Sequence, residues 1–478
     1  MAKNIKNKRV SSGQSRVVKG KRLDISLRAV IDNMAFSKTD RWAYYRLSNL
    51  PFDFLDADSK FRLGKQIHNA FVSLMAERQN PLECHLVVDS TPIDVDALRQ
   101  QNLEEAAHWM SNVANFEDYL DLQEEFLREK EYMEKVVYLG VHLGRRGSQD
   151  IDAMGIVEGG IKSAFDTARE ALKSVMLSPT DVIPKSEEEY TRNRESEVFQ
   201  VLSTGHLQAE RVTSEDILLM IKRQLYPAMP APYLDVDPAS RLGPGDLALE
   251  FGHEIWNRFR WLKIGQIVGD EEMHGHRATL AFSKFPRQSE FPQSYPFMYF
   301  LSRLGLPFTM YSRFSLYPTS HLKKEIDKQT KEVVDGVKNY SVGGETIDSA
   351  VSGFPPELQG SLDDIQTVKT VINGDKAPWI SGSYYVVVET PTEQLLKKYC
   401  AIVKQKFTDL DINVTWTAGD QAKLFLEQMP GDRVRVGAFT QITNIGQLGA
   451  SGMNFASEVG DEIKPRRRTD RVGGRKDG

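Results

Sequence analysis

The stretch that decides the fold runs WISGSYYVVVETPTEQLLKKYCAIVKQKF at residues 379–407 and DINVTWTAGDQAKLFLEQMPGDRVRVGAF at residues 411–439. Each part opens with a β-branched and aromatic run typical of a strand and continues into an amphipathic helix. The second part ends at a Pro-Gly corner, Gln428-Met429-Pro430-Gly431-Asp432, and the Gly-rich residues 441–462 that follow are predicted to be a loop.

The first half of the chain has the same mixture of elements. We expect the first element near Arg41, where RWAYYRLSN places Trp42 and Tyr44 on one face of a strand and Ala43 and Tyr45 on the other. A helix is predicted to run from Asp56–Lys60 to Met75. Its apolar side chains are Phe61, Ile67, Phe71 and Leu74.

Further strands are predicted at ECHLVVDS, KVVYLGVHLG, WLKIGQIVG, HRATLAFSKF and PFTMYSRFSLY, and further helices at about 94–110, 116–135, 160–176 and 213–225. This order fits an α+β fold with mixed sheets and packed helices in two halves. The expected domains are a basic tail at 1–28, an α+β domain at 29–226, a Pro/Gly-rich linker at 227–245, a second α+β domain at 246–461 and a basic tail at 462–478. Polar helices within about 319–373 are expected to form a protruding hairpin in the second domain.

Charge is segregated along the chain. The net charge is −5, but residues 1–28 carry nine basic side chains and one acidic one, and residues 464–478 carry seven and two. The body between them therefore has a net charge of −18. Basic ends on an acidic body suggest contact with nucleic acid or anionic lipid at the ends, or simply solubilising tails.

The composition predicts a reducing compartment and a cytoplasmic location. The two cysteines, Cys84 and Cys400, are too few for a disulfide framework and are expected to be buried. No apolar run is long enough to span a bilayer, and MAKNIKNKRV has no apolar core of a signal peptide.

No nucleotide-binding motif is found. A P-loop requires G-x-x-x-x-G-K-[ST], and the nearest stretch, Gly155 to Ser163, has Ile161 where the lysine should stand and Lys162 one place late. No apolar run ends in the paired acids that hold magnesium. We therefore expect no catalytic, cofactor-binding or metal-binding residues in this chain.

Other candidate sites have simpler explanations. His274 and His276, with Asp270, Glu271, Glu272 and His253, are explained by a polar hairpin turn rather than by zinc, and Asp235 with Asp237 by a solvated loop. Cys84 and His85 are neighbours in a strand, so their side chains point to opposite faces and cannot form an activated thiolate. The aromatic and basic stretch at 256–261 (Trp256, Arg258, Phe259, Arg260, Trp261) suggests base stacking, or equally core aromatics flanked by arginines.

The Pro-Gly corner after an amphipathic helix resembles the N-terminal domain of the conjugative-transfer ATPases of type IV secretion systems, in their actinobacterial and clostridial branch. The resemblance extends to Arg41–Tyr45, Phe52–Leu55, His85–Val88, Pro92–Leu98 and Pro378–Glu389, and covers most of residues 40–461. It implies a protein that works at the cytoplasmic face of the cell membrane, usually as an oligomer. Its implied partners are membrane subunits of the channel and other ATPases. ATP and magnesium are implied only for a motor domain that would follow this one.

The sequence therefore predicts a non-catalytic component of a conjugative or type IV secretion apparatus that acts by docking partner subunits. Two alternatives remain. The chain is either part of a split or truncated ATPase whose motor lies on another chain, or a nucleic-acid-binding accessory protein that uses its basic ends.

Overall fold

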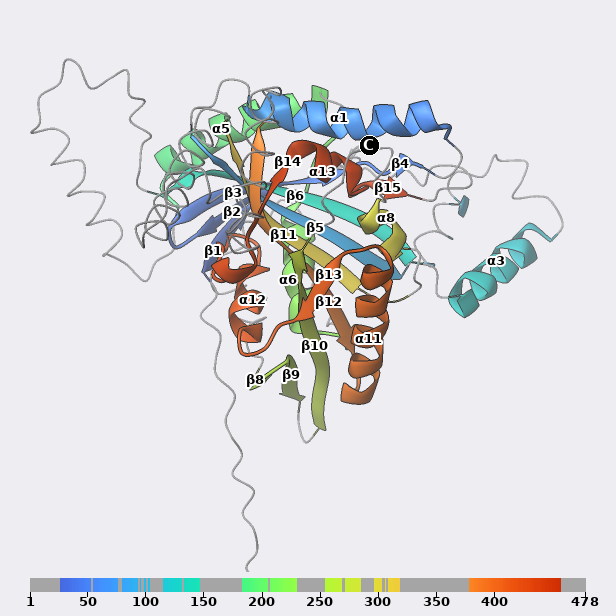
Figure 1. Cartoon of the computed structure of the whole chain (residues 1–478). Helices are drawn as coiled ribbons and strands as arrows, with labels where there is room; N and C mark the ends of the chain where they lie inside the picture. Colours follow the sequence, from blue (N-terminus) through green and yellow to red (C-terminus); the bar gives the residue numbers. More distant parts are fainter. Residues whose placement is uncertain are drawn as a thin grey trace, which may run out of the picture.

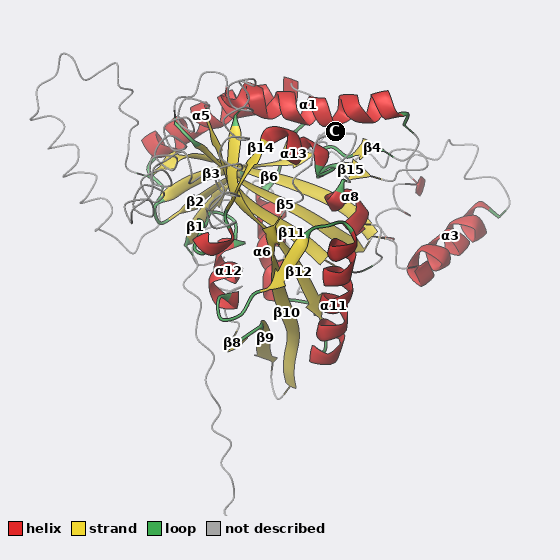
Figure 2. Cartoon of the chain, in the orientation of Figure 1, coloured by secondary structure: helices red, strands yellow, loops and turns green. Residues whose placement is uncertain are grey.

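The computed structural model describes residues 26–52, 55–75, 80–92, 115–130, 133–146, 183–204, 207–229, 254–268, 271–284, 296–302, 308–318 and 378–456, with single positions at 95, 99, 102, 103 and 306. These segments form a broad antiparallel sheet with helices packed on both of its faces (Figures 1 and 2). The structure confirms the predicted α+β class.

The main sheet has 13 strands. Its order is β1 (Leu27–Ile31), β2 (Met34–Ser37), β3 (Asp40–Leu47), β6 (Met133–Arg145), β5 (Leu82–Pro92), β11 (Phe308–Tyr317), β12 (Trp379–Thr390), β10 (Glu271–Lys284), β9 (Trp261–Val268) and β8 (Glu254–Arg258). Three short strands lie off this path: β7 (Glu210–Arg211) pairs with β3, β13 (Asn413–Trp416) with β10, and β14 (Gln441–Asn444) with β12. A separate parallel pair joins β4 (Leu50–Pro51) to β15 (Phe455–Ala456).

The two halves predicted from the sequence share this sheet. β5 from the first half pairs with β11 from the second, from Leu82 opposite Leu316 to Asp89 opposite Thr309. The proposed linker at 227–245 therefore does not coincide with a break in the sheet.

Two apolar cores lie on opposite faces of the sheet. The first core packs against α1 (Ala57–Met75), α5 (Lys185–Thr204), α8 (Phe297–Ser302), α11 (Glu393–Asp409) and α13 (Ile445–Ala450). The second core packs against α6 (Ser214–Leu225) and α12 (Gln421–Glu427). In β3 the alternation predicted from the sequence is confirmed, because Ala43 and Tyr45 enter the first core and Trp42 and Tyr44 the second.

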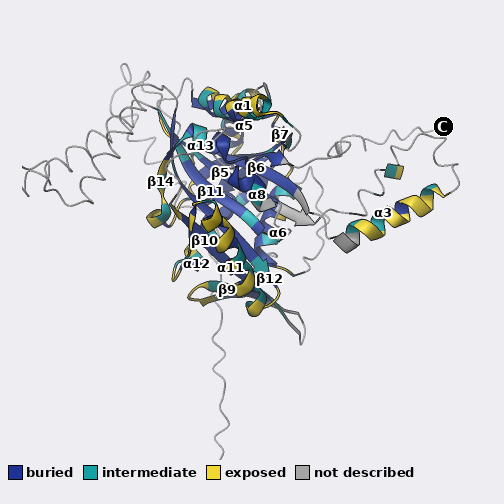
Figure 3. Cartoon of the chain, turned by 45° about the vertical axis from the view of Figure 1, so that its right-hand side comes forward, coloured by how far each residue is buried: buried dark blue, intermediate teal, exposed yellow. Residues whose placement is uncertain are grey.

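Not every helix lies on the sheet. α3 (Phe116–Lys130) stands to one side of it in both views (Figures 1 and 3), and a short 3-10 helix, η3 (Gly437–Phe439), follows the corner. In the part of the chain that the structure describes, no helix is both long enough and apolar enough to cross a membrane.

Three predictions near the N-terminus were wrong in detail. The first element is β1 rather than a strand near Arg41, so the basic segment 1–28 ends inside a strand. β1 and β2 form a hairpin around Asp32 and Asn33, with Asp32 at φ 53°, a conformation that Asp tolerates better than most residues. Phe61 is 43% exposed, because it lies about 120° around α1 from Ile67.

The expected loop at 441–462 was also wrong over residues 441–456, which contain β14, α13 and β15. The glycines there permit close packing: a Cβ on Gly449 would lie 2.6 Å from the carbonyl oxygen of Gly64 in α1. The predicted helix at 160–176, most of the linker at 227–245, the helical insertion at 319–373 and the C-terminal tail lie outside the described residues.

Candidate functional site

The Pro-Gly corner lies against the sheet, on the face of the second core. Gly431 has φ 77°, and a Cβ there would lie 3.2 Å from the side chain of Leu27, so glycine suits both the backbone and the space. The Gly431 N–H donates to the hydroxyl oxygen of Tyr44 over 3.0 Å. A residue of the C-terminal part of the chain is thereby fixed to a strand of the N-terminal part.

Tyr44 reaches the corner because its neighbour in the sheet is a glycine. Tyr44 pairs with Gly140, which pairs with His85, so the three lie in one row across β3, β6 and β5. A Cβ on Gly140 would lie 2.5 Å from the Tyr44 ring. The Tyr44 hydroxyl lies 3.2 Å from Nδ1 of His85.

The surroundings of His85 and Tyr44 favour the neutral form of each side chain. Burial, and secondarily the charge of Arg313, holds the pKa of His85 well below its usual value. Burial also raises the pKa of Tyr44. Because the Tyr44 oxygen already accepts from Gly431, its O–H is free to donate to Nδ1 of a neutral His85.

Arg313 continues the row on β11 and binds the corner directly. Its Nε donates to the carbonyl of Glu427 over 2.9 Å and its Nη2 to the carbonyl of Met429 over 2.6 Å. Its guanidinium also lies 4.9 Å from the centre of the Trp42 ring. These charge-assisted bonds satisfy two carbonyls where α12 ends.

Three glutamines also attach α12 and the corner to the rest of the fold. Gln428 accepts from Arg277 over 2.7 Å, and its carbonyl accepts from the Gln224 side chain over 2.9 Å. Gln421, at the start of α12, bonds both the N–H and the carbonyl of Thr279 over 2.9 Å. β10, β11 and α6 thus join β3 in holding the segment from α12 to the corner.

Glu427 organises the chain after the corner. It accepts from the N–H groups of Arg435 over 2.8 Å and Val436 over 3.0 Å, and from the hydroxyl of Tyr385 over 3.1 Å. Burial raises the pKa of Glu427, although its hydrogen bonds and the charge of Arg313 act in the opposite direction. We call the set made of Tyr44, His85, Arg277, Arg313, Gln421, Glu427 and Gln428 the corner network.

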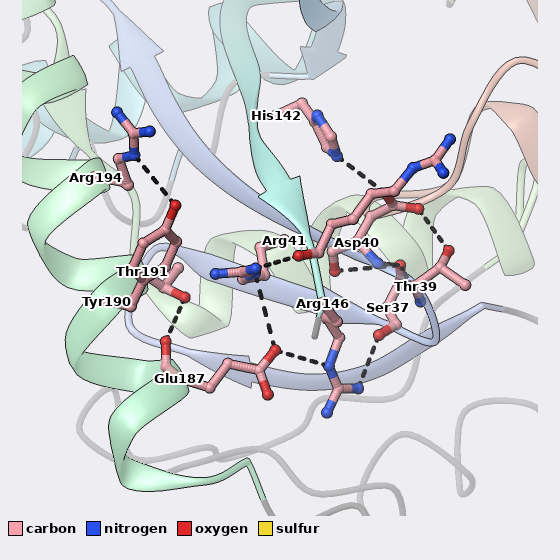
Figure 4. Close-up of polar contacts among 11 residues, drawn as sticks. Ser37, Thr39, Asp40, Arg41, His142, Arg146, Glu187, Tyr190, Thr191 and Arg194 are labelled. Atoms are coloured by element: carbon pink, nitrogen blue, oxygen red, sulfur yellow. Dashed lines mark hydrogen bonds and ion pairs between the residues drawn. The ribbon is translucent and has the colours of Figure 1, made fainter. Parts of the chain in front are cut away.

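A second polar cluster lies at the adjoining edge of the sheet (Figure 4). Asp40 bonds the ring of His142 over 3.0 Å and the hydroxyl of Thr39 over 2.6 Å, and pairs with Arg433 just after the corner. Burial raises the pKa of Asp40, but these hydrogen bonds outweigh it and hold the pKa at about 2.

The same edge connects to α5. Arg146 donates to Glu187 over 3.0 Å and to the carbonyl of Ser37 over 2.9 Å, and Arg41 lies 3.9 Å from the same glutamate (Figure 4). Each of these cations has a carboxylate partner on a neighbouring element. The cluster therefore ties α5 to the sheet.

The histidines and Cys84 considered as candidate sites in the sequence lie in strands where the structure describes them. His274 and His276 lie in β10 and not in a turn, which corrects that part of the prediction. No group of three or more His, Cys, Asp or Glu suited to a metal occurs among the described residues. Cys84 and Cys400 are free and buried, and Cys84 enters the first core while His85 faces Tyr44. Gly155–Ser163, Asp235, Asp237 and His253 lie outside the described residues.

The structure adds residues that the sequence reasoning missed. Arg277 and Arg313 are 1% and 2% exposed, and each lies in the middle of a long strand among buried neighbours. A charged residue in the middle of such a strand was the available signal, because a buried arginine requires partners.

α3, which stands apart from the sheet, carries three large apolar side chains that are exposed. Tyr119, Leu122 and Phe126 are 60%, 65% and 49% exposed, and their spacing puts them on one side of the helix. Leu120 is buried on the other side. Exposed acidic residues, including Asp118 and Glu125, border the exposed strip.

Comparisons with known proteins add no family: no family model matches the chain, and no curated protein matches its sequence.

Proposed function

We propose that this chain is a non-catalytic component of a conjugative DNA-transfer or type IV secretion apparatus, and that it acts by docking partner subunits. The kind of apparatus rests on the resemblance of the Pro-Gly corner and the strand motifs to the N-terminal domain of the transfer ATPases. The docking role rests on the exposed apolar strip of α3.

The strip supports docking because of its area and its surroundings. Exposed apolar residues are common singly, but three on one side of a helix form a contiguous patch. α3 contains six acidic residues and two basic ones, so its partner should present apolar side chains flanked by lysine or arginine. A basic amphipathic helix of a partner subunit has this chemistry.

The corner network supports the proposal in a different way. Its residues are buried and bonded to one another, so the corner is a point of attachment within the domain.

Transfer of DNA between cells tests the proposal. The chromosomal or plasmid copy is replaced by the double variant Tyr119→Ser/Leu122→Ser, and transfer frequency is measured at equal protein level. We expect a loss of about tenfold or more, because apolar burial of two such side chains is removed from the interface. Leu219→Ser, which changes a 48% exposed leucine on α6, is the matched control and should leave transfer unchanged.

Two results would refute the proposal. Unchanged transfer after deletion of the whole gene would exclude a role in the apparatus. Hydrolysis of ATP by the purified chain, abolished by Lys162→Ala, would exclude a non-catalytic role. Co-purification with a P-loop protein whose ATP turnover the chain stimulates would instead identify it as half of a split ATPase.

A further inference from the structure

The turn between β8 and β9 presents a phenylalanine to solvent. Arg258 pairs with Trp261, so Phe259 and Arg260 form a two-residue hairpin turn. Phe259 is 68% exposed and has φ 35°. The favoured two-residue hairpin turns need a positive φ at this position and usually take Gly, Asn or Asp there.

Two hydrogen bonds hold the turn in this conformation. The Gly419 N–H donates to the carbonyl of Phe259 over 2.6 Å, and Nε1 of Trp416 donates to the carbonyl of Arg260 over 2.6 Å. The turn is therefore fixed by the last residue of β13 and by the segment that leads from it to α12. A strained, fixed and exposed aromatic residue points to a functional role, because burial does not explain it.

Cations surround this residue. Arg258 and Arg260 flank it and are exposed, and Lys263 lies on the next strand. Two acids lie at the starts of the adjoining helices, Glu393 in the first turn of α11 and Asp420 at the N-cap of α12. Glu393 pairs with Lys397 over 2.6 Å and Asp420 with Lys423 over 3.1 Å. The neighbourhood thus keeps an excess of positive charge beside the exposed phenylalanine.

The neighbouring tryptophans are already covered by cations of the chain. Lys263 lies 5.1 Å from the centre of the Trp256 ring, Lys397 lies 5.2 Å from that of Trp261, and Arg260 lies 5.9 Å from that of Trp416. These rings are therefore poor stacking platforms for bases. A single apolar side chain at the tip of a hairpin, flanked by arginines, suits the interface of a lipid bilayer better than a strand of nucleic acid.

We propose that the β8–β9 turn docks on an anionic lipid surface, with Phe259 inserted among the acyl chains and Arg258 and Arg260 on the headgroup phosphates. This contact is separate from the α3 strip and does not require the proposed function. It is also separate from the basic ends of the chain, which attract anionic lipid by charge alone.

Flotation of the full-length chain with vesicles tests the proposal. The vesicles contain either 30% phosphatidylserine in phosphatidylcholine or phosphatidylcholine alone. We expect binding to the anionic vesicles, a loss of about tenfold or more in the partition coefficient for Phe259→Ser, and a similar loss for Arg258→Gln/Arg260→Gln. Ile442→Ser, which changes a 48% exposed residue of β14, is the matched control and should bind as the wild type does.

A second variant separates lipid contact from folding. Phe259→Gly relieves the positive φ, so it should unfold at the same temperature as the wild type or higher while losing vesicle binding. The proposal fails if the wild type does not float with anionic vesicles, or if Phe259→Ser and Phe259→Gly float as well as the wild type. It also fails if Phe259→Ser weakens binding to a labelled oligothymidine and leaves flotation unchanged, a result that would assign the turn to single-stranded nucleic acid.

Discussion

Replacing Arg313 with methionine should loosen the Pro-Gly corner specifically. Arg313 donates to the carbonyls of Glu427 and Met429, and methionine fills similar space without a donor. A hydrogen bond to a charged group contributes about 1.5–3 kcal/mol, so the loss of two amounts to roughly 3–6 kcal/mol. The Nη1 of Arg313 is buried without a hydrogen-bond partner, so removing this charge recovers about 1–3 kcal/mol of the lost stability. The difference spans roughly 0–5 kcal/mol, and because both carbonyls stay buried without a donor, the net cost should be about 2–4 kcal/mol.

Hydrogen exchange followed by mass spectrometry measures this cost where it arises. In a peptide covering 428–436, the amides of Gly431, Arg435 and Val436 are protected by Tyr44 and Glu427. A cost of about 2–4 kcal/mol corresponds to roughly 30- to 1000-fold faster exchange at these amides. Peptides from α11, on the opposite face of the sheet, should exchange as in the wild type.

Arg435→Met is the matched control. Arg435 is also an arginine beside the corner, but it is 34% exposed, and its side chain pairs with Asp432 over 2.7 Å. Arg435 reaches solvent although its partner Asp432 is only 6% exposed, so its loss should cost roughly 1–2 kcal/mol and speed exchange less than Arg313→Met does. Equal protection in wild type and Arg313→Met, or a larger effect of Arg435→Met, would refute the assigned role of Arg313.

Two pH profiles of unfolding check the buried charges. Burial lowers the pKa of Lys135 from 10.5 to about 7, although its Nζ donates to the carbonyls of Gly452 and Phe455. The unfolded chain then binds the extra proton between these pH values, so the wild type should gain about 3–4 kcal/mol of stability relative to Lys135→Met as the pH rises from about 7 to 10. Parallel profiles would contradict the buried ammonium. The pKa of Asp40 is lowered to about 2, so its contribution to the free energy of unfolding is present above about pH 4 and is lost toward pH 2. In urea unfolding, Asp40→Asn should therefore remove about 2 kcal/mol at pH 7 and nothing at pH 2. A difference that does not change with pH would count against the cluster.

Much of the sheet could be predicted from the sequence, because its long strands are rich in β-branched and aromatic residues. β3, β5, β6, β11 and β12 all belong to this class. The short elements were harder. α13 has only six residues, two of them glycines, and Ser451 and Gly452 follow it, so its packing against α1 decides its conformation more than its propensity does.

The Pro-Gly corner was recognised in the sequence, but the residues that hold it against the sheet were not. Tyr44 and Gly431 are 387 residues apart, and nothing in the local pattern of either predicts that they meet. Gly140 looks like an ordinary strand glycine until the Tyr44 ring is placed over it. The exposed Phe259 was visible in the sequence, but its positive φ could be known only once Arg258 was seen to pair with Trp261.

The pairing of β5 with β11 has a consequence for how the chain is made. Leu82 pairs with Leu316, so 234 further residues must be synthesised before the strand that pairs with this edge of β5 is complete. At usual rates of translation this takes on the order of 10–50 s. During that time an apolar strand with unpaired backbone groups is available to pair wrongly with another nascent chain. Production of this protein should therefore depend more on chaperones and on slow expression than its final stability would suggest.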